Sequence, residues 1–90
     1  REDERTWRGQ GTILVVDDEE SLRTSCARLL EALGFTPVLA AHGQQAVEIF
    51  RENPRLFSAV MLDLTMPHMD GHETFSALRK IRPDVKVILM

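Results

Sequence analysis

Apolar positions along the chain alternate between short continuous runs and longer stretches with helical spacing. Four short runs rich in branched residues are typical of strands covered on both faces: 12–16 (TILVV), 37–40 (PVLA), 59–62 (AVML) and 85–90 (VKVILM). Three segments between them carry apolar residues three, four or seven positions apart. The pattern therefore predicts four strands and three helices in strict alternation.

The first predicted helix follows the first strand. Its apolar stripe consists of Leu22, Cys26, Leu29, Leu30 and Leu33. Gly34 follows as the predicted C-terminal cap, because glycine readily adopts the left-handed conformation that ends a helix. We expect Cys26 to behave as a small buried hydrophobe on this stripe.

Two further helices are predicted from the same spacing and from the prolines that follow them. The second carries Ala46, Val47 and Phe50 and closes before Pro54; the third carries Phe75, Leu78 and Ile81 and stops at Pro83. Strands separated by single helices favour right-handed parallel crossovers. We therefore predict an α/β fold with a doubly wound parallel sheet, helices on both faces, and ligands bound at the carboxyl ends of the strands.

Composition fits one small globular domain, with 90 residues, 43% of them hydrophobic and 28% charged. The net charge is -3 and the basic residues are scattered, so we expect no nucleic-acid contact through this segment. No apolar run approaches the ~20 residues of a membrane helix, so no membrane contact by this segment is expected, although a larger parent could be membrane-anchored. The single Cys26 suits a reducing compartment, and we predict a cytoplasmic location.

Acidic side chains follow two of the predicted strands. Asp17-Asp18-Glu19-Glu20 come directly after the first strand, and Asp63 comes directly after the third. If these strands are neighbours, about 4.8 Å apart, the carboxylates meet at one edge of the sheet. Two such charges ~5 Å apart cost roughly 3 kcal/mol at an effective dielectric of 20, so a proton, a basic residue or a cation must offset them. An all-oxygen, anionic site favours Mg²⁺.

Two segments, ILVVDDEESLR and VMLDLTMPHMDGHE, resemble the signatures of the receiver domain of two-component response regulators, which has a flavodoxin-like fold. The resemblance covers Thr12 to Met90. It implies that Asp63 is the phosphoacceptor, that Asp18 is a direct Mg²⁺ ligand, and that Asp17 acts on the ion largely through water. It also implies that Thr65 gives its backbone carbonyl to the metal.

The implied function is a phosphoacceptor switch. Asp63 would take a phosphoryl group from the phosphohistidine of a histidine kinase or a histidine phosphotransfer domain and so change partner binding. Such a domain is a switch rather than a turnover enzyme. Two alternatives stay open: a degenerate, phosphate-independent interaction domain, and an Asp-nucleophile Mg²⁺ phosphatase of the haloacid-dehalogenase kind. The second alternative is disfavoured because Thr65 stands where that class has a second acid.

The loop after Asp63 is expected to frame the site. Met66-Pro67 and Asp70-Gly71 would shape it, with Asp70 as a turn former and Gly71 supplying a permissive backbone conformation. The family pattern also requires a Ser or Thr after the fourth strand and a Lys after the fifth. Neither position is present before Met90, nor are the fourth helix, fifth strand and fifth helix.

We therefore expect residues 12–90 to be the N-terminal part of a receiver, with a sheet truncated after the fourth strand. That strand, with Val85, Val87, Ile88 and Leu89, would then be an uncovered edge. A homo-oligomer, an exchange of elements between copies, or the remainder of the parent would cover it. Residues 1–11 are predicted to be a linker or tail. Because this segment ends in WRGQG, it resembles the joint before the C-terminal receiver of a hybrid histidine kinase.

Other polar residues have simpler interpretations. Glu19 and Glu20 are interpreted as helix caps that complement the helix dipole. His42, His68 and His72 are interpreted as solvated loop or helix-start residues rather than as ligands of a transition metal, because His42 belongs to a different loop.

Overall fold

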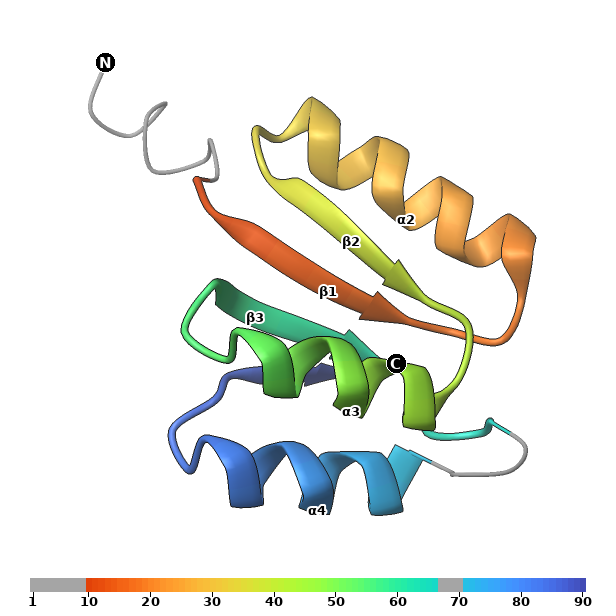
Figure 1. The fold of residues 1–90 in the computed structure, drawn as a ribbon. Helices are drawn as coiled ribbons and strands as arrows, with labels where there is room; N and C mark the ends of the chain where they lie inside the picture. Colours follow the sequence, from red (N-terminus) through yellow and green to blue (C-terminus); the bar gives the residue numbers. More distant parts are fainter. Residues whose placement is uncertain (1–9, 67–70) are drawn as a thin grey trace.

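The computed structural model describes residues 10–66 and 71–90, and within them strands and helices alternate as predicted. The elements, shown in Figure 1, are β1 (Thr12–Val16), α2 (Glu20–Ala32), β2 (Thr36–Ala40), α3 (Gly43–Glu52), β3 (Phe57–Leu62), α4 (Gly71–Ile81) and β4 (Val87–Leu89). Every predicted strand and helix in this part of the chain is confirmed. Of the predicted linker, residues 1–9 lie outside the described part, and the Gly11 carbonyl already accepts a hydrogen bond from Thr36 N–H (2.8 Å).

The four strands form one parallel sheet in the order β2-β1-β3-β4. Val16, the last residue of β1, pairs with Ala40 of β2 on one side and with Leu62 of β3 on the other. The carboxyl ends of three strands therefore lie level at one edge of the sheet. Whatever residues follow these strands are brought together there.

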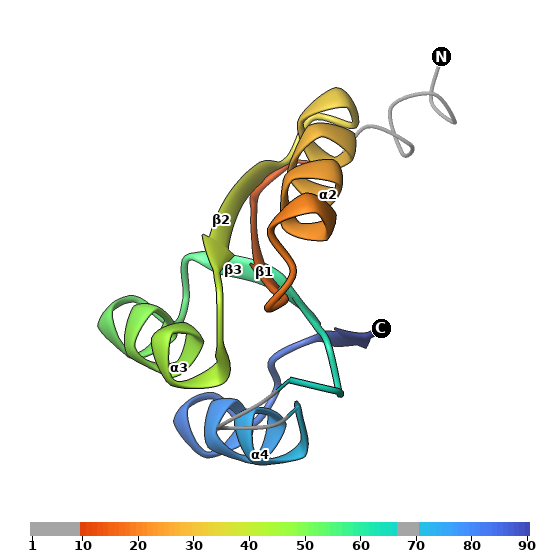
Figure 2. The ribbon, with the colours of Figure 1, turned by 90° about the vertical axis from the view of Figure 1, so that its right-hand side faces the viewer.

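Helices cover both faces of the sheet, which confirms the doubly wound α/β arrangement (Figure 2). One face packs against α3 and α4, and the other packs against α2. The larger core contains Leu14, Val16, Val60 and Leu62 of the sheet with Ala46, Val47 and Phe50 of α3 and Leu78 of α4. The smaller core contains Ile13, Val15 and Leu30. Strands buried on both sides explain why their sequences are apolar throughout rather than alternating.

The apolar stripe of α2 is less buried than its spacing indicates. Leu22 and Leu29 are 48% and 61% exposed, and Cys26, predicted to be buried, is half-buried. Only Leu30 of this helix reaches full burial. Within the described residues α2 is the one helix on its face of the sheet, so the sides of the stripe have no neighbour to cover them.

The cap predicted at Gly34 is confirmed. Gly34 has φ 100°, and its N–H donates to the carbonyl of Glu31 (3.0 Å), while Phe35 N–H donates to that of Leu30 (2.9 Å). This pair of bonds is the Schellman arrangement, in which a residue with positive φ satisfies the last carbonyls of a helix. Phe35 also packs with Leu30 in the smaller core, so the cap directs the chain into β2.

β4 is shorter than predicted and forms an edge of the sheet. Ile88 and Leu89 are each 52% exposed, as expected for an uncovered edge strand. Val85, which was expected to be uncovered with them, is buried instead. It precedes the strand, donates its N–H to Arg82 O (3.1 Å) and packs into the larger core, because the turn after α4 folds it inward.

Candidate functional site

The acidic residues that follow β1 and β3 meet at the carboxyl edge of the sheet. Asp63 N–H donates to Val16 O (3.0 Å) and Asp17 N–H donates to Ala40 O (3.2 Å), so the strand ladder continues into both acids. One carboxylate oxygen from each of Asp17, Asp18 and Asp63 lies within 4.8 Å of the others. The convergence predicted from the sequence is confirmed, and it follows from the adjacency of β1 and β3.

Asp17 is the most buried of the three, with 5% of its surface exposed. Its Oδ1 accepts the N–H of Glu19 (2.9 Å). The pKa of Asp17 is raised above its ordinary value, chiefly because burial disfavours the charged carboxylate; the Glu19 N–H opposes the rise, and the charges of Asp63 and Asp18 add to it. Burial and the neighbouring carboxylates therefore both disfavour the charged form of Asp17, and a bound cation would offset them.

Asp63 is half-buried and is held by the residue two positions later. Thr65 donates both its backbone N–H and its Oγ1 hydroxyl to Asp63 Oδ1, each at 2.9 Å. Both bonds fix the rotamer of the carboxylate while leaving it at the sheet edge. The hydroxyl of Thr65, to which the sequence assigned no side-chain role, thus orients the central acid. Its predicted role through the backbone carbonyl stays a prediction.

Asp18 is exposed, and an arginine six residues after Asp17 contacts the backbone beside it. Arg23 Nη1 donates to the carbonyl oxygen of Asp17 (2.8 Å). Sequence reasoning missed this contact. The one available signal was the spacing, which places Arg23 in the first turn of α2, directly over the loop that carries the acids.

Gly71 begins α4 and lies against the loop that leaves Asp63. A methyl group at this position would stand 2.7 Å from the Asp63 carbonyl oxygen and would overlap the backbone of Leu64. Among the described glycines only Gly11 and Gly34 have positive φ, so the permissive conformation expected at Gly71 is not what its position requires. Glycine is needed there for close approach, and its N–H donates to Leu64 O (3.3 Å).

The donor chemistry fits a hard divalent cation. Asp17, Asp18 and Asp63 are the only group of three or more potential ligand residues that converge within residues 10–66 and 71–90. The donors are all carboxylate oxygens from short, closely spaced side chains. Hard cations such as Mg²⁺ prefer oxygen ligands, whereas softer metals prefer nitrogen or sulfur. Pro67, His68 and Asp70, whose roles were predicted from the sequence, lie outside the described residues.

The residues interpreted as caps divide into two kinds. Glu19 occupies the N-cap position of α2, as predicted, but its side chain makes no cap hydrogen bond; its backbone N–H donates to Asp17 Oδ1. Glu20 lies in the first turn, as predicted. His42 caps α3, with Nδ1 accepting the N–H of Gln45 (3.1 Å), and His72 is exposed on α4. Neither histidine joins the carboxylates.

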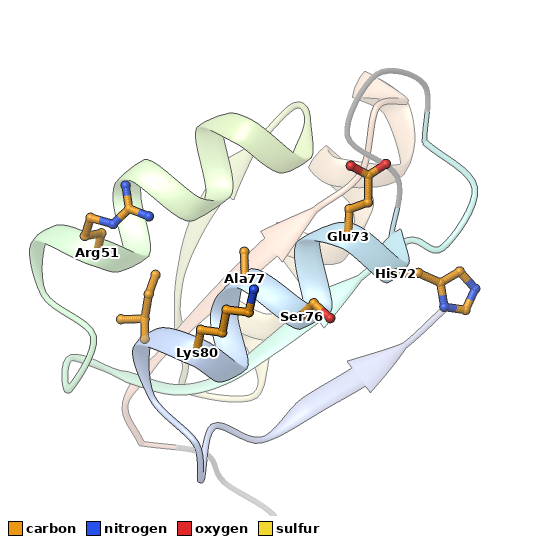
Figure 3. Close-up of a pocket in the computed structure, with 7 residues that line it drawn as sticks. Arg51, His72, Glu73, Ser76, Ala77 and Lys80 are labelled. Carbon is orange, nitrogen blue, oxygen red and sulfur yellow. The ribbon is translucent and has the colours of Figure 1, made fainter.

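A surface hollow of about 620 Å³ lies elsewhere, between the C-terminal part of α3 and the length of α4 (Figure 3). Its lining includes the exposed side chains of Arg51, His72 and Lys80, with Ala77 and Ile81 between the helices. None of the three converging acids borders it. The candidate chemistry is therefore at the open sheet edge.

Within the described residues no helix is long and apolar enough to cross a membrane.

Comparisons with known proteins agree with this geometry. The response regulator receiver domain family matches residues 13–90. The chain is 39% identical over 82 residues to the sensor kinase CckA of Brucella abortus, covering 91% of this chain and 9% of that protein. It thus spans a small part of this relative.

Two solved structures are close in fold. The receiver domain from the hybrid histidine kinase CckA superposes with a TM-score of 0.82 at 34% identity, over 88% of this chain and 73% of that one. A CheX-CheY-BeF3-Mg²⁺ complex from Borrelia burgdorferi gives 0.84 at 29% identity, over 88% and 60%. Sequence and fold agree along almost the whole described chain, including the strand ends that bear the acids. The chain therefore belongs to the response regulator receiver domain family of two-component systems, with the flavodoxin-like fold of CheY.

Proposed function

We propose that this chain is a phosphoacceptor switch in which Asp63 takes a phosphoryl group from the phosphohistidine of a histidine kinase or a histidine phosphotransfer domain. The observation that supports this most is the convergence of Asp63 with Asp17 and Asp18 within 4.8 Å at the sheet edge. Asp63 is positioned there by Thr65 and is half-buried, so one side of the carboxylate is accessible to a donor.

The chemistry is a displacement at phosphorus. A carboxylate oxygen of Asp63 attacks the phosphorus atom, an oxygen–phosphorus bond forms, and the phosphorus–nitrogen bond to the donor imidazole breaks with its electron pair returning to nitrogen. The product is an acyl phosphate on Asp63, and no oxidant or reductant is involved. Asp63 is the catalytic residue because its oxygen is the reacting atom.

Asp17, Asp18, Asp63 and the Thr65 carbonyl are the groups we propose to hold Mg²⁺. When bound, this ion supplies positive charge that offsets the negative charge on the phosphoryl oxygens and on the carboxylates. Asp17, buried and fixed by Glu19 N–H, forms the rigid side of the site. Asp18 is exposed and completes the carboxylate set from the outside.

The test is adduct formation with a small phosphodonor. The full chain is incubated with Mg²⁺ and either acetyl phosphate or beryllofluoride, and intact mass and fluorine NMR report the product. We expect a stable adduct on the parent sequence and none on Asp63→Asn, with Asp84→Asn as a matched control because Asp84 is an exposed acid far from the site. Beryllofluoride is an appropriate probe because the CheX-CheY complex contains it together with Mg²⁺.

The other outcomes distinguish the alternatives. Continuous release of phosphate with no accumulating adduct would indicate an Asp-nucleophile phosphatase. No adduct and no turnover in the full-length parent would indicate a phosphate-independent interaction domain. The geometry disfavours a phosphatase of the haloacid-dehalogenase kind, because the residue two positions after Asp63 is Thr65, whose hydroxyl is engaged with Asp63 Oδ1.

We further propose that the parent of this chain is a hybrid histidine kinase located in, or facing, the cytoplasm. The similarity to the CckA sensor kinase and to the CckA receiver supports this context. Proposed partners are therefore a histidine kinase or phosphotransfer domain, with no nucleic-acid or membrane contact through this segment. Pairing of copies through the exposed edge of β4 stays a prediction, to be tested by sedimentation of the full chain.

A further inference from the structure

One side chain outside the acid cluster contacts the backbone that carries it. Arg23 Nη1 donates to the carbonyl oxygen of Asp17 at 2.8 Å, and the arginine is half-buried against the loop between β1 and α2. This carbonyl belongs to the peptide group that joins Asp17 to Asp18. Because a peptide group is planar and moves as a unit, holding its oxygen restricts its rotation and so limits the directions in which the next residue can depart.

The two acids joined by this peptide are held very differently. Asp17 has its N–H bonded to Ala40 O and its Oδ1 bonded to Glu19 N–H. Within residues 10–66 and 71–90 the carboxylate of Asp18 accepts no hydrogen bond, and it is exposed. Its place within 4.8 Å of the other two acids is therefore set by the backbone and not by side-chain partners.

We propose that Arg23 is a positioning residue that holds the Asp17–Asp18 peptide so that Asp18 points toward the cation shared with Asp17 and Asp63. The proposal rests on the proposed function, because it concerns the Mg²⁺ site of the same carboxylates. Arg23 does not touch the ion or the reacting atoms. It acts through the peptide that orients Asp18.

The direction of the change in Mg²⁺ Kd distinguishes a positioning role of Arg23 from a purely electrostatic one. A guanidinium near a cation site repels the cation, so loss of the positive charge alone makes Mg²⁺ binding tighter. Loss of the hydrogen bond frees the peptide, and binding becomes weaker because Asp18 must then be ordered when the ion binds. The two roles therefore predict opposite changes in Kd for the same substitution.

The experiment measures Mg²⁺ affinity of the metal-free full chain by titration calorimetry, alongside the thermal unfolding midpoint without Mg²⁺. For Arg23→Met we expect Kd to rise about tenfold, the order seen when groups that orient metal ligands are removed. Arg23→Lys, which keeps a donor and the charge, is expected to stay within about threefold of the parent sequence. The unfolding midpoint without Mg²⁺ is expected to change little, since a single part-buried hydrogen bond at the surface contributes little to the free energy of unfolding.

Arg28→Met is the matched control. The Arg28 side chain is exposed on the same helix and makes no hydrogen bond or ion pair within the described residues, so the substitution removes the same charge without the contact. Its Kd is expected to be unchanged or slightly lower. Arg23→Gln serves as a second variant if Arg23→Met does not fold, with the same expected direction.

A Kd equal to or tighter than that of the parent sequence, in whichever of Arg23→Met and Arg23→Gln folds, overturns the positioning role. So does a fall in the unfolding midpoint with no change in Kd, which would indicate a merely structural contact. Failure of the parent sequence itself to bind Mg²⁺ overturns the proposed function and this inference together. If the parent sequence binds Mg²⁺ and the Arg23 variants bind it equally well, the positioning role is overturned while the proposed function stands.

Discussion

Arg82, in the turn after α4, donates to the carbonyl oxygens of Phe57 (2.7 Å) and Pro54 (3.1 Å) at the amino end of β3, and pairs with Asp84. At the opposite, carboxyl end of the same strand, Asp63 lies among like charges, and within the described residues no Lys or Arg side chain forms an ion pair with it. At the amino end, the charge of Arg82 and the carbonyls of Pro54 and Phe57 are thus paired within the chain. The other end leaves charge to be balanced from outside, which is the arrangement expected of a binding site and costs stability.

The strongest test of this contrast removes one acid from each end. Asp18→Asn is expected to weaken Mg²⁺ binding by about 100-fold, because one of three charged oxygen ligands is lost. Asp84→Asn, at the opposite end, is expected to leave Mg²⁺ affinity unchanged. Calorimetric titration measures both, and equal affinities in the two variants would contradict the assignment of the cation to the carboxyl edge.

A second test crowds the loop at the carboxyl end. Gly71→Ala is expected to destabilise the protein by about 2–3 kcal/mol, since the new methyl group would collide with the backbone of Leu64 and with the Asp63 carbonyl. Urea unfolding measures the stability, and Mg²⁺ titration measures the site. Unchanged stability together with unchanged Mg²⁺ affinity would show that the loop accommodates a side chain there.

A third test removes Arg82, whose side chain pairs with backbone carbonyls at the amino end of β3. Arg82→Met is expected to lower the free energy of unfolding by about 2 kcal/mol, because two carbonyls lose a charged donor in a partly buried turn. Adduct formation at Asp63 and Mg²⁺ affinity are expected to persist in the folded fraction. Arg79→Met is the control, since the Arg79 side chain is exposed, lies over the Phe75 ring and donates to one carbonyl, that of Pro83 in the same turn.

The raised pKa of Asp17 predicts a pH dependence of the opposite sign to that of an ordinary ion-paired acid. Because its folded pKa lies above its unfolded value, near 3.8, the folded state binds the proton more tightly. The contribution of Asp17 to the free energy of unfolding is fully present below pH 3.8 and is lost as the pH rises through the raised pKa of the folded state. At neutral pH without Mg²⁺, Asp17→Asn is therefore expected to stabilise the protein by about 1 kcal/mol.

Thermal unfolding between pH 4 and 7 measures this effect. The midpoint of the parent sequence is expected to fall more steeply with rising pH than that of Asp17→Asn, in the absence of Mg²⁺. Addition of Mg²⁺ is expected to raise the midpoint of the parent but not of the variant. A variant that is less stable than the parent at pH 7 without Mg²⁺ would show that Asp17 is needed for the fold.

The smallest expected effect concerns the two kinds of leucine on α2. Leu29→Gln is expected to change stability by less than about 0.5 kcal/mol, because Leu29 is mostly exposed. Leu30→Gln, one position later and buried against Ile13 and Val15, is expected to be clearly more destabilising. Chemical unfolding of the two variants compares them. Equal losses would indicate that Leu29 is covered in solution.

The periodicity of the sequence determined the order and type of the elements, and the residues after β1 and β3 determined the acids of the site. Both are local properties. The spacing of apolar residues along the chain indicates whether a segment is a strand or a helix, and Asp17, Asp18 and Asp63 directly follow their strands. Gly34 was predictable for the same reason, because a cap depends on its own φ.

Only the tertiary structure decided how these residues are covered and what touches them. Asp17 and Asp18 are adjacent in sequence, yet one is buried and the other exposed, and Leu29 and Leu30 differ in the same way. The burial of Val85, the close approach at Gly71 and the contact of Arg23 with Asp17 likewise depend on neighbours distant in the chain or on a turn in space. Burial and contact are set by which elements pack together, and no single segment carries that information.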